Sequence, residues 1–141
     1  MCIRDRGWAE GYRGLEAELR ARDNILRRIR AEVRDDFLIL VNTNRRTIPR
    51  TGTHINGIFM ETLRDNEDGY TLKGIKEIET ALLWAEENLR EPQINSLEGW
   101  GIPTESPDSP TNRRWMRVFT TMGLTHSDGY VLYNRGIDHN H

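Results

Sequence analysis

The sequence predicts an α/β fold in which parallel strands alternate with helices, on three observations. Short apolar runs of strand length alternate with longer segments whose apolar residues recur at helical spacing. The expected order is helix, strand, strand, helix, strand, helix, strand. The first strand run, residues 37–41 (FLILV), is continuously apolar, which is typical of a strand buried on both faces of a parallel sheet. This combination favours a parallel sheet.

Three segments have the periodicity of amphipathic helices. From about Gly14 to Arg34, Leu, Ile and Val recur at three-, four- and seven-residue spacings. Acidic residues are interleaved with the arginines of this segment at distances that permit i to i+4 pairing, so we interpret the arginines as a solvated outer face rather than an RNA-binding face. The second helix is predicted over 72–89, before Glu91-Pro92, and the third over 112–123.

Four segments are predicted as strands. After residues 37–41, the segments 55–61, 93–99 and 129–134 follow, and the third is the most polar of them. The connection between the first two strands is short for a helical crossover. A doubly wound open sheet is the alternative arrangement, but no glycine-rich phosphate turn follows any predicted strand.

The chain is shorter than a complete eight-stranded (β/α) barrel. Four strands and three helices cannot close an eight-stranded (β/α) barrel, which typically needs about 250 residues, and the chain has 141. We expect part of a TIM-type barrel, truncated at both ends, as a single partial domain over residues 7–141. Residues 1–6 (MCIRDR) resemble translated sequencing-adapter sequence at the start of metagenomic reading frames, so we expect them to be foreign to the fold.

The composition excludes several classes of partner. With 36% hydrophobic and 30% charged residues, the chain has the balance of a soluble globular domain, and no apolar run approaches the roughly 18 residues of a membrane span. A net charge of -2 gives no excess of cations to attract nucleic acid. The single cysteine, Cys2, cannot form an internal disulfide, and no CxxC spacing indicates zinc or redox chemistry.

Polar side chains end each predicted strand, where the active sites of parallel α/β folds lie. Two are carboxylates on separate strands, Glu61 and Glu98, and glycosidic chemistry needs one carboxyl to protonate the leaving oxygen and another as base or nucleophile. A strand-end Glu also caps helices or pairs with Arg, so a structural interpretation stays open. The other candidates, as substrate contacts at strand ends, are Asn42, Asn44, Trp100 and Asn134.

Two other groups of residues, a possible catalytic triad and a possible metal-binding tail, give weaker functional signals. Ser127, His126 and Asp128 are adjacent in one segment, where side chains rarely aim at one another, and no Gly-x-Ser-x-Gly elbow exists, so a serine hydrolase is not favoured. The tail at 138–141 (DHNH) has metal-ligating residue types, but we interpret it as a truncated end. We therefore expect no metal and no organic cofactor.

Four segments together resemble a known family. They are residues 36–44 (DFLILVNTN), 55–62 (INGIFMET), 92–99 (PQINSLEG) and 127–134 (SDGYVLYN). They are similar to the later strands of hypothetical glycosyl-hydrolase barrels related to endo-α-1,4-polygalactosaminidases, over about residues 30–136. In that family a strand of the form hydrophobic-Asp/Asn-Gly-hydrophobic-x-x-Glu carries an acidic residue at the sugar site. An earlier strand that ends in Asp is absent from this chain.

The resemblance implies the C-terminal part of a TIM (β/α)8 barrel and a glycoside hydrolase that acts on a polysaccharide. Glu61 is then the catalytic acid/base or nucleophile, Glu98 its partner or a substrate ligand, and Asn56 a substrate contact. An extracellular or cell-envelope setting is also implied, and the fragment without the rest of its barrel is expected to be inactive. The alternative is a non-catalytic carbohydrate-binding or surface-assembly domain, because fold alone does not establish activity.

Overall fold

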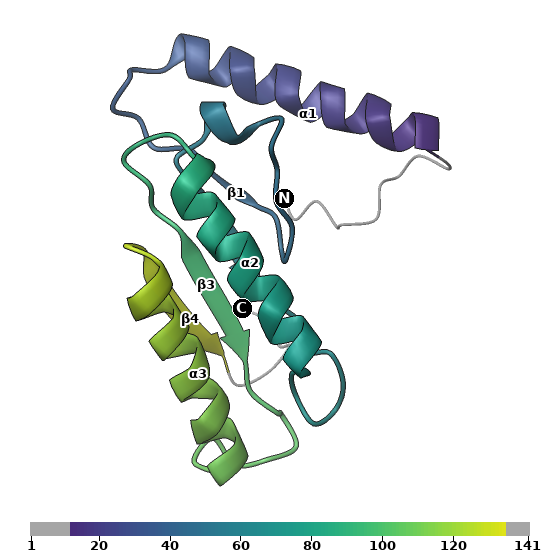
Figure 1. Cartoon of the computed structure of the whole chain (residues 1–141), viewed down its shortest axis with the longest axis vertical. Coiled ribbons are helices and arrows are strands. Elements are labelled where there is room, and N and C mark those ends of the chain that lie inside the picture. The colour runs from purple at the N-terminus through teal and green to yellow at the C-terminus, as the bar shows by residue number, and fades with distance from the viewer. Residues whose placement is uncertain (1–11, 135–141) are drawn as a thin grey trace.

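A parallel sheet of four strands forms the centre of the chain, in a computed structural model that describes residues 12–134 (Figure 1). The strands lie in sequence order, β1-β2-β3-β4, which confirms the predicted alternation and the predicted parallel sheet. The predicted leader (1–6) and the tail (138–141) lie outside the described residues. The elements are α1 (Tyr12–Glu32), β1 (Leu40–Asn42), the 3₁₀ turn η1 (Gly52–His54), β2 (Gly57–Glu61), α2 (Leu72–Asn88), β3 (Ser96–Trp100), α3 (Pro110–His126) and β4 (Tyr130–Asn134).

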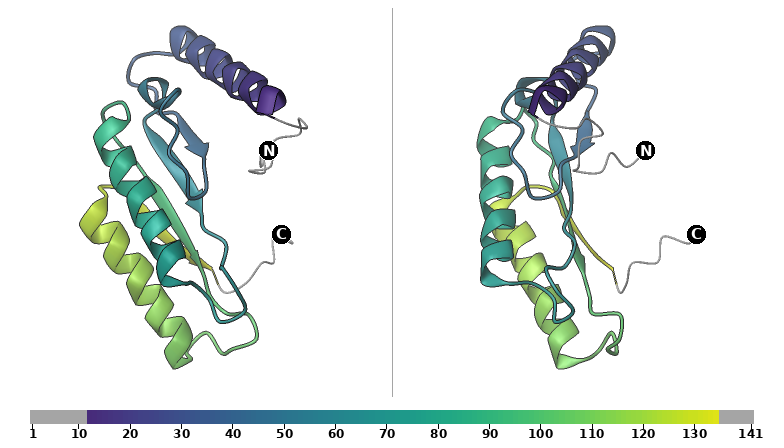
Figure 2. Two further views of the ribbon diagram at one scale, coloured as in Figure 1. Left: turned by 45° about the vertical axis from the view of Figure 1, so that its right-hand side comes forward. Right: turned by 90° about the vertical axis from the view of Figure 1, so that its right-hand side faces the viewer.

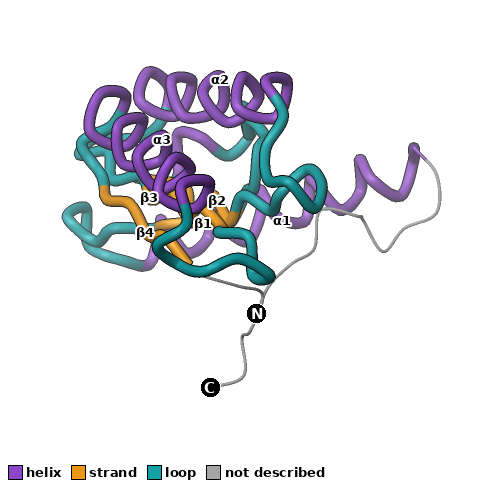
Figure 3. The backbone as a smooth tube through the Cα atoms, turned by 90° about the horizontal axis from the view of Figure 1, so that it is seen from below, coloured by secondary structure: helices purple, strands orange, loops and turns teal. Residues whose placement is uncertain are grey.

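Helices α2 and α3 both lie on one face of the sheet, as Figure 2 and Figure 3 show from two directions. Helix α2 connects β2 to β3, and α3 connects β3 to β4. Met60 and Leu97 of the strands are buried with Ile78 of α2 and Phe119 of α3 in the main core. We call this side the helix face. Because side chains alternate along a strand, the intervening residues point to the second face of the sheet.

Both of these helices begin at a capping side chain. The hydroxyl of Thr71 accepts the N–H of Gly74 at 3.0 Å, and that of Ser109 accepts the N–H of Asn112 at 3.0 Å, with Pro110 in the first turn of α3. The second helix begins at the predicted residue. The third begins two residues before the prediction, because Pro110 is compatible with a first helical turn.

Strand β1 is shorter and more exposed than the sequence predicts. The apolar run starts at Phe37, but the N–H of Phe37 donates to the carbonyl of Arg34 at 3.0 Å in a turn after α1, and the strand begins only at Leu40. Within the described residues β1 pairs with β2 alone, and Leu40 is 36% exposed. The expectation of burial on both faces is therefore wrong, because β1 lies at an edge of the described sheet.

The connection from β1 to β2 contains the single turn η1 and no α-helix, as its short length predicts. Helix α1 packs against this connection and carries one correction. Arg30 does not belong to a solvated face: its guanidinium donates to the carbonyls of His54 (3.1 Å) and Phe37 (2.9 Å) and to Oδ1 of Asn56 (2.8 Å). Arg30 therefore ties α1 to the segment before β1 and to the end of the connection that leads into β2.

Candidate functional site

The two predicted carboxylates lie side by side at the carboxyl end of the sheet. Glu61 of β2 and Glu98 of β3 are register partners in neighbouring parallel strands. Residues paired in this way project from the same face, and neighbouring strands are about 4.8 Å apart. Both alternate with core residues, Met60 and Leu97, that point to the helix face. Glu61 and Glu98 therefore share the second face at the edge where strand-end sites form in parallel sheets.

Asn42 belongs to the same group of residues. It is the register partner of Phe59 and hence projects from the same face as Glu61. Its side-chain amide Nδ2 donates a hydrogen bond of 3.1 Å to Oε2 of Glu61. One carboxylate oxygen of Glu61 is thus oriented by an amide from the neighbouring strand, as expected for a positioned catalytic or ligand-binding acid.

Glu98 is the more buried of the pair, with 9% of the residue exposed. Its backbone carbonyl is also held, since it accepts the N–H of Thr62 at 3.2 Å and the hydroxyl of Thr62 at 2.5 Å. Thr62 directly follows Glu61 and is itself fully buried. The ends of β2 and β3 are therefore fixed relative to each other just where the two carboxylates lie.

Tyr70, from the loop between β2 and α2, closes the same region from the helix face. Its hydroxyl donates to the carbonyl of Thr62 at 2.7 Å and accepts the N–H of Trp100 at 2.7 Å. Its ring packs on Phe119 (centroids 4.8 Å apart) and on Trp115 (5.2 Å). Burial raises the pKa of Tyr70, so the hydroxyl stays neutral and keeps both bonds.

A second polar network lies in the loops after β1 and β2. The guanidinium of Arg45 pairs with Asp65 and donates to the carbonyl of Leu63. The other Asp65 oxygen accepts the N–H and the hydroxyl of Thr71, at 2.7 and 2.9 Å. Burial alone raises the pKa of Asp65, but the hydrogen bonds from Thr71 and Arg45 and the charge of Arg45 outweigh it and lower that pKa below 3.8.

The other predicted site residues are not all brought to this edge. Asn56 precedes β2 and is buried at the opposite end of the sheet. Its Oδ1 accepts the N–H of Ile39 at 3.2 Å as well as Arg30, and its Nδ2 lies 3.2 Å from the carbonyl of Glu91. The structure therefore gives Asn56 a bracing role between α1, β1 and the segment that leads to β3, away from Glu61.

Trp100, Asn44 and Asn134 lie at strand ends as predicted, but in different settings. Trp100 is 1% exposed, so its ring is enclosed rather than presented as a platform for a sugar. Asn44 follows β1 in the left-handed region (φ 54°), a conformation that Asn tolerates better than most residues. Asn134 is the register partner of Trp100, and its side chain is outside the described part of the structure.

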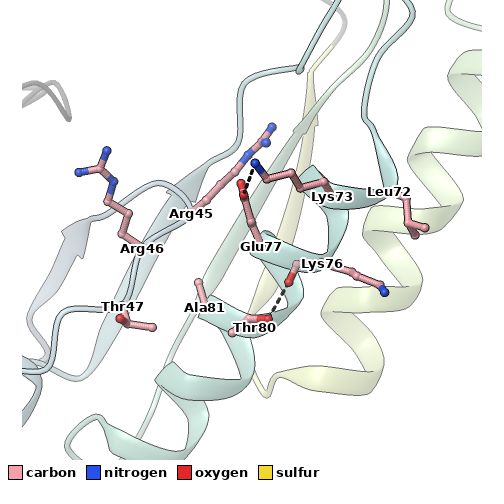
Figure 4. A pocket seen from close by; sticks show the side chains of 9 residues that line it. All are labelled: Arg45, Arg46, Thr47, Leu72, Lys73, Lys76, Glu77, Thr80 and Ala81. Atoms are coloured by element: carbon pink, nitrogen blue, oxygen red, sulfur yellow. Dashed lines mark hydrogen bonds and ion pairs between the residues drawn. The ribbon is translucent and has the colours of Figure 1, made fainter.

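Two adjoining hollows open beside this edge, with volumes of about 760 and 590 Å³. The larger lies between the loop after β1 and the first half of α2, and Figure 4 shows the side chains that line it. The smaller is lined by residues that follow β1 and β2, among them Asn44 and Arg64. Arg45, Arg46 and Glu77 line both, so we treat the two hollows as one groove and call it the basic groove.

Sequence reasoning missed the residues that hold this edge together. Tyr70 and the pair Arg45 and Asp65 come from loops, and their partners are backbone groups brought near by the parallel pairing. Only Thr71 left a signal in the sequence, since a Thr directly before a periodic segment is a common helix cap. Hydrogen bonds to a distant backbone leave no residue pattern along the chain.

No family model matches the sequence, and no curated protein or solved structure matches it significantly. Within residues 12–134, no cluster of three or more His, Cys, Asp or Glu side chains has a metal-binding arrangement. In the same part of the chain, none of the helices is long and apolar enough to cross a membrane.

Proposed function

We propose that this protein is a glycoside hydrolase acting on a polysaccharide, with Glu61 and Glu98 as its pair of carboxylates. The pairing of Glu61 with Glu98 in register on one face, at the carboxyl end of a parallel sheet, carries the proposal. Glu61 serves as acid/base or nucleophile, because the amide of Asn42 orients its carboxylate. Glu98 takes the complementary role: it is nucleophile or base if Glu61 protonates the leaving oxygen, and acid/base if Glu61 is the nucleophile.

The winding of the chain supports a (β/α) barrel as the setting. Strands in the order 1-2-3-4 with α2 and α3 on the same face follow the single winding of a barrel, whereas a doubly wound sheet places helices on both faces. In a barrel the second face becomes the interior, and the carboxyl ends of the strands form the rim where active sites lie. Glu61, Glu98 and Asn42 then belong to that rim.

The decisive experiment is the change Glu61→Gln in the full-length gene product. Gln keeps the size of the side chain and its hydrogen bond with Asn42 through the amide oxygen, but it neither transfers a proton nor attacks an anomeric carbon. Release of reducing sugar is expected to fall by about 10²–10⁴-fold, the usual contribution of acid–base catalysis, while binding of the polysaccharide stays within about twofold.

Glu91→Gln, an exposed carboxylate in the turn before β3, is the matched control and should leave turnover unchanged. Unaltered hydrolysis by Glu61→Gln would remove Glu61 from the mechanism. Sugar binding by the unmodified protein without turnover, over a panel of polysaccharides, would instead favour the non-catalytic carbohydrate-binding alternative.

A further inference from the structure

The basic groove is lined by more cationic than anionic side chains, whereas the whole chain has a small negative net charge. The chain carries a net charge of -2, yet the side chains lining the groove include five cations, against the two carboxylates of Asp65 and Glu77. The five cations are Arg45, Arg46, Arg64, Lys73 and Lys76. The side chains that line the groove therefore carry a net positive charge, unlike the chain as a whole.

Asp65 neutralises one of the five cations, Arg45, whereas Glu77 neutralises little of the remaining charge. Asp65 is already held by Arg45 and by Thr71. Glu77 lies 3.9 Å from Lys73, but these side chains are 48% and 87% exposed, and exposed pairs of this kind are weak. Figure 4 shows Arg45 and Arg46 on the loop side of the larger hollow and Lys73 on the helix side. The groove thus keeps a positive potential.

Two lysines and the amino end of α2 also contribute to the positive potential of the groove. Lys73 and Lys76 are the only lysines in the 141 residues, and both line the groove. They lie in the first turns of α2, whose amino end adds the positive end of the helix dipole.

The smaller hollow is lined by residues that lie close along the chain to the candidate active site. Asn44 lies two residues beyond Asn42, and Arg64 lies three residues beyond Glu61, and both line this hollow. A polymer at the Glu61 edge would continue along the loops after β1 and β2 to α2. None of the described residues lining the groove is aromatic, so it has no platform for stacking nucleic-acid bases.

We propose that the basic groove binds the acidic groups of an anionic polysaccharide, uronate carboxylates or sulfates, whose chain continues to Glu61 and Glu98. This inference rests on the proposed hydrolase function and names the class of its substrate. Cations spaced along the groove suit charges repeated along a sugar chain, and Arg46, Arg64, Lys73 and Lys76 supply charge beyond the pair of Arg45 with Asp65.

Lysine labelling tests the contact directly, because Lys73 and Lys76 are the only lysines of these 141 residues and the peptides that carry them can be read separately. The full-length protein with Glu61→Gln is treated with an amine-reactive reagent in the presence of polygalacturonate or dextran sulfate, and labelling is read by peptide mass spectrometry. Polygalacturonate and dextran sulfate separate the carboxylate from the sulfate source. Fully methyl-esterified polygalacturonate and plain dextran are the neutral counterparts. Protection by at least one anionic polymer, and by neither neutral one, is expected.

Affinity measurements on variants complete the test. The double change Lys73→Glu with Lys76→Glu should weaken anionic-polymer binding by about tenfold for each lost cation. The control changes Arg28→Glu with Arg117→Glu, at exposed positions on α1 and α3, alter the net charge equally and should leave binding within about twofold.

Equal weakening by both double variants would reduce the interaction to overall charge and overturn the proposal, as would absence of protection by either anionic polymer. Tighter binding of an oligothymidylate would overturn it in favour of a phosphate polymer. Because binding is read in the Glu61→Gln background, protection without any turnover in the unmodified protein would contradict the hydrolase while leaving the anionic ligand in place.

Discussion

The Tyr70 hydroxyl links two strands through their backbones. It bridges the carbonyl of Thr62 and the N–H of Trp100, and all three residues are buried. Water therefore has little access to replace it. This phenolic oxygen, together with the hydrogen bonds from Thr62 to the Glu98 carbonyl, thus holds the ends of β2 and β3 at the spacing on which the pair Glu61 and Glu98 depends.

Tyr70→Phe keeps the ring packing and removes only this oxygen. Both backbone groups would then be buried without a partner, so we expect a loss of about 1–3 kcal/mol in the free energy of unfolding. Urea denaturation followed by tryptophan fluorescence measures it. Tyr130→Phe is the control, because Tyr130 is 47% exposed, and it should change stability by less than about 0.5 kcal/mol. Equal effects of the two changes would contradict the bridging role.

Strand β3 and helix α3 approach each other closely at Gly99. A Cβ atom at this position would lie 2.5 Å from Cγ of Phe119, which is too close for any carbon contact. Gly123 of α3 lies equally close to β4, since a Cβ there would lie 2.0 Å from a methyl carbon of Val131. The absence of two side chains, one on each element, lets α3 lie against β3 and β4.

Gly99→Ala is therefore expected to destabilise the protein by about 1–3 kcal/mol, because Phe119 must move from its place against Tyr70. Combining it with Phe119→Leu should cost less than the sum of the two single changes, by about 0.5–3 kcal/mol. A double-mutant cycle from urea denaturation gives this coupling energy. Strictly additive effects would show that the steric contact does not determine the packing of α3.

Asp65 at acid pH and the buried tyrosines Tyr70 and Tyr133 at alkaline pH limit the range over which the whole molecule is stable. The pKa of Asp65 is lowered in the folded protein, so its contribution is present above the ordinary pKa of 3.8 and is lost as the pH falls through the lower folded value. Burial raises the pKa of Tyr133 from 10.0 to about 12, and the nearby Tyr70 adds to this effect. That contribution is complete below pH 10 and is lost as the pH rises toward about 12.

We expect urea midpoints to fall at both ends of a pH series because of these groups. In the Asp65→Asn variant, the urea midpoint should fall less steeply with decreasing pH below about pH 4, and its decrease at alkaline pH should be unchanged. In the Tyr133→Phe variant, the urea midpoint should fall less steeply at alkaline pH and its decrease at acid pH should be unchanged. One high-pH transition in tyrosinate absorbance should also be lost. An acid limb that is identical in the Asp65 variant would mean that other carboxylates set the acid stability.

The candidate site was predicted in part, for a reason that lies in strand geometry. Asn42, Glu61 and Glu98 were found from the sequence because residues that end apolar runs meet at one edge once the strands are parallel. Asn56 was assigned to the same site only through the family resemblance, whose Asp/Asn-Gly motif matches Asn56 and Gly57. The structure places it at the opposite end of the sheet, where it braces Arg30 and Ile39.

The sequence by itself determined the helices, the strands and their parallel alternation, because apolar periodicity and capping residues act within a few positions of the chain. Only the tertiary structure decided that β1 lies at an edge of the described sheet, that α2 and α3 share one face, and that Glu61 lies beside Glu98 in register. The bridge made by Tyr70 and the basic groove were also decided there. These features join residues far apart in the chain, and their contacts depend on strand register and backbone approach, which no local pattern records.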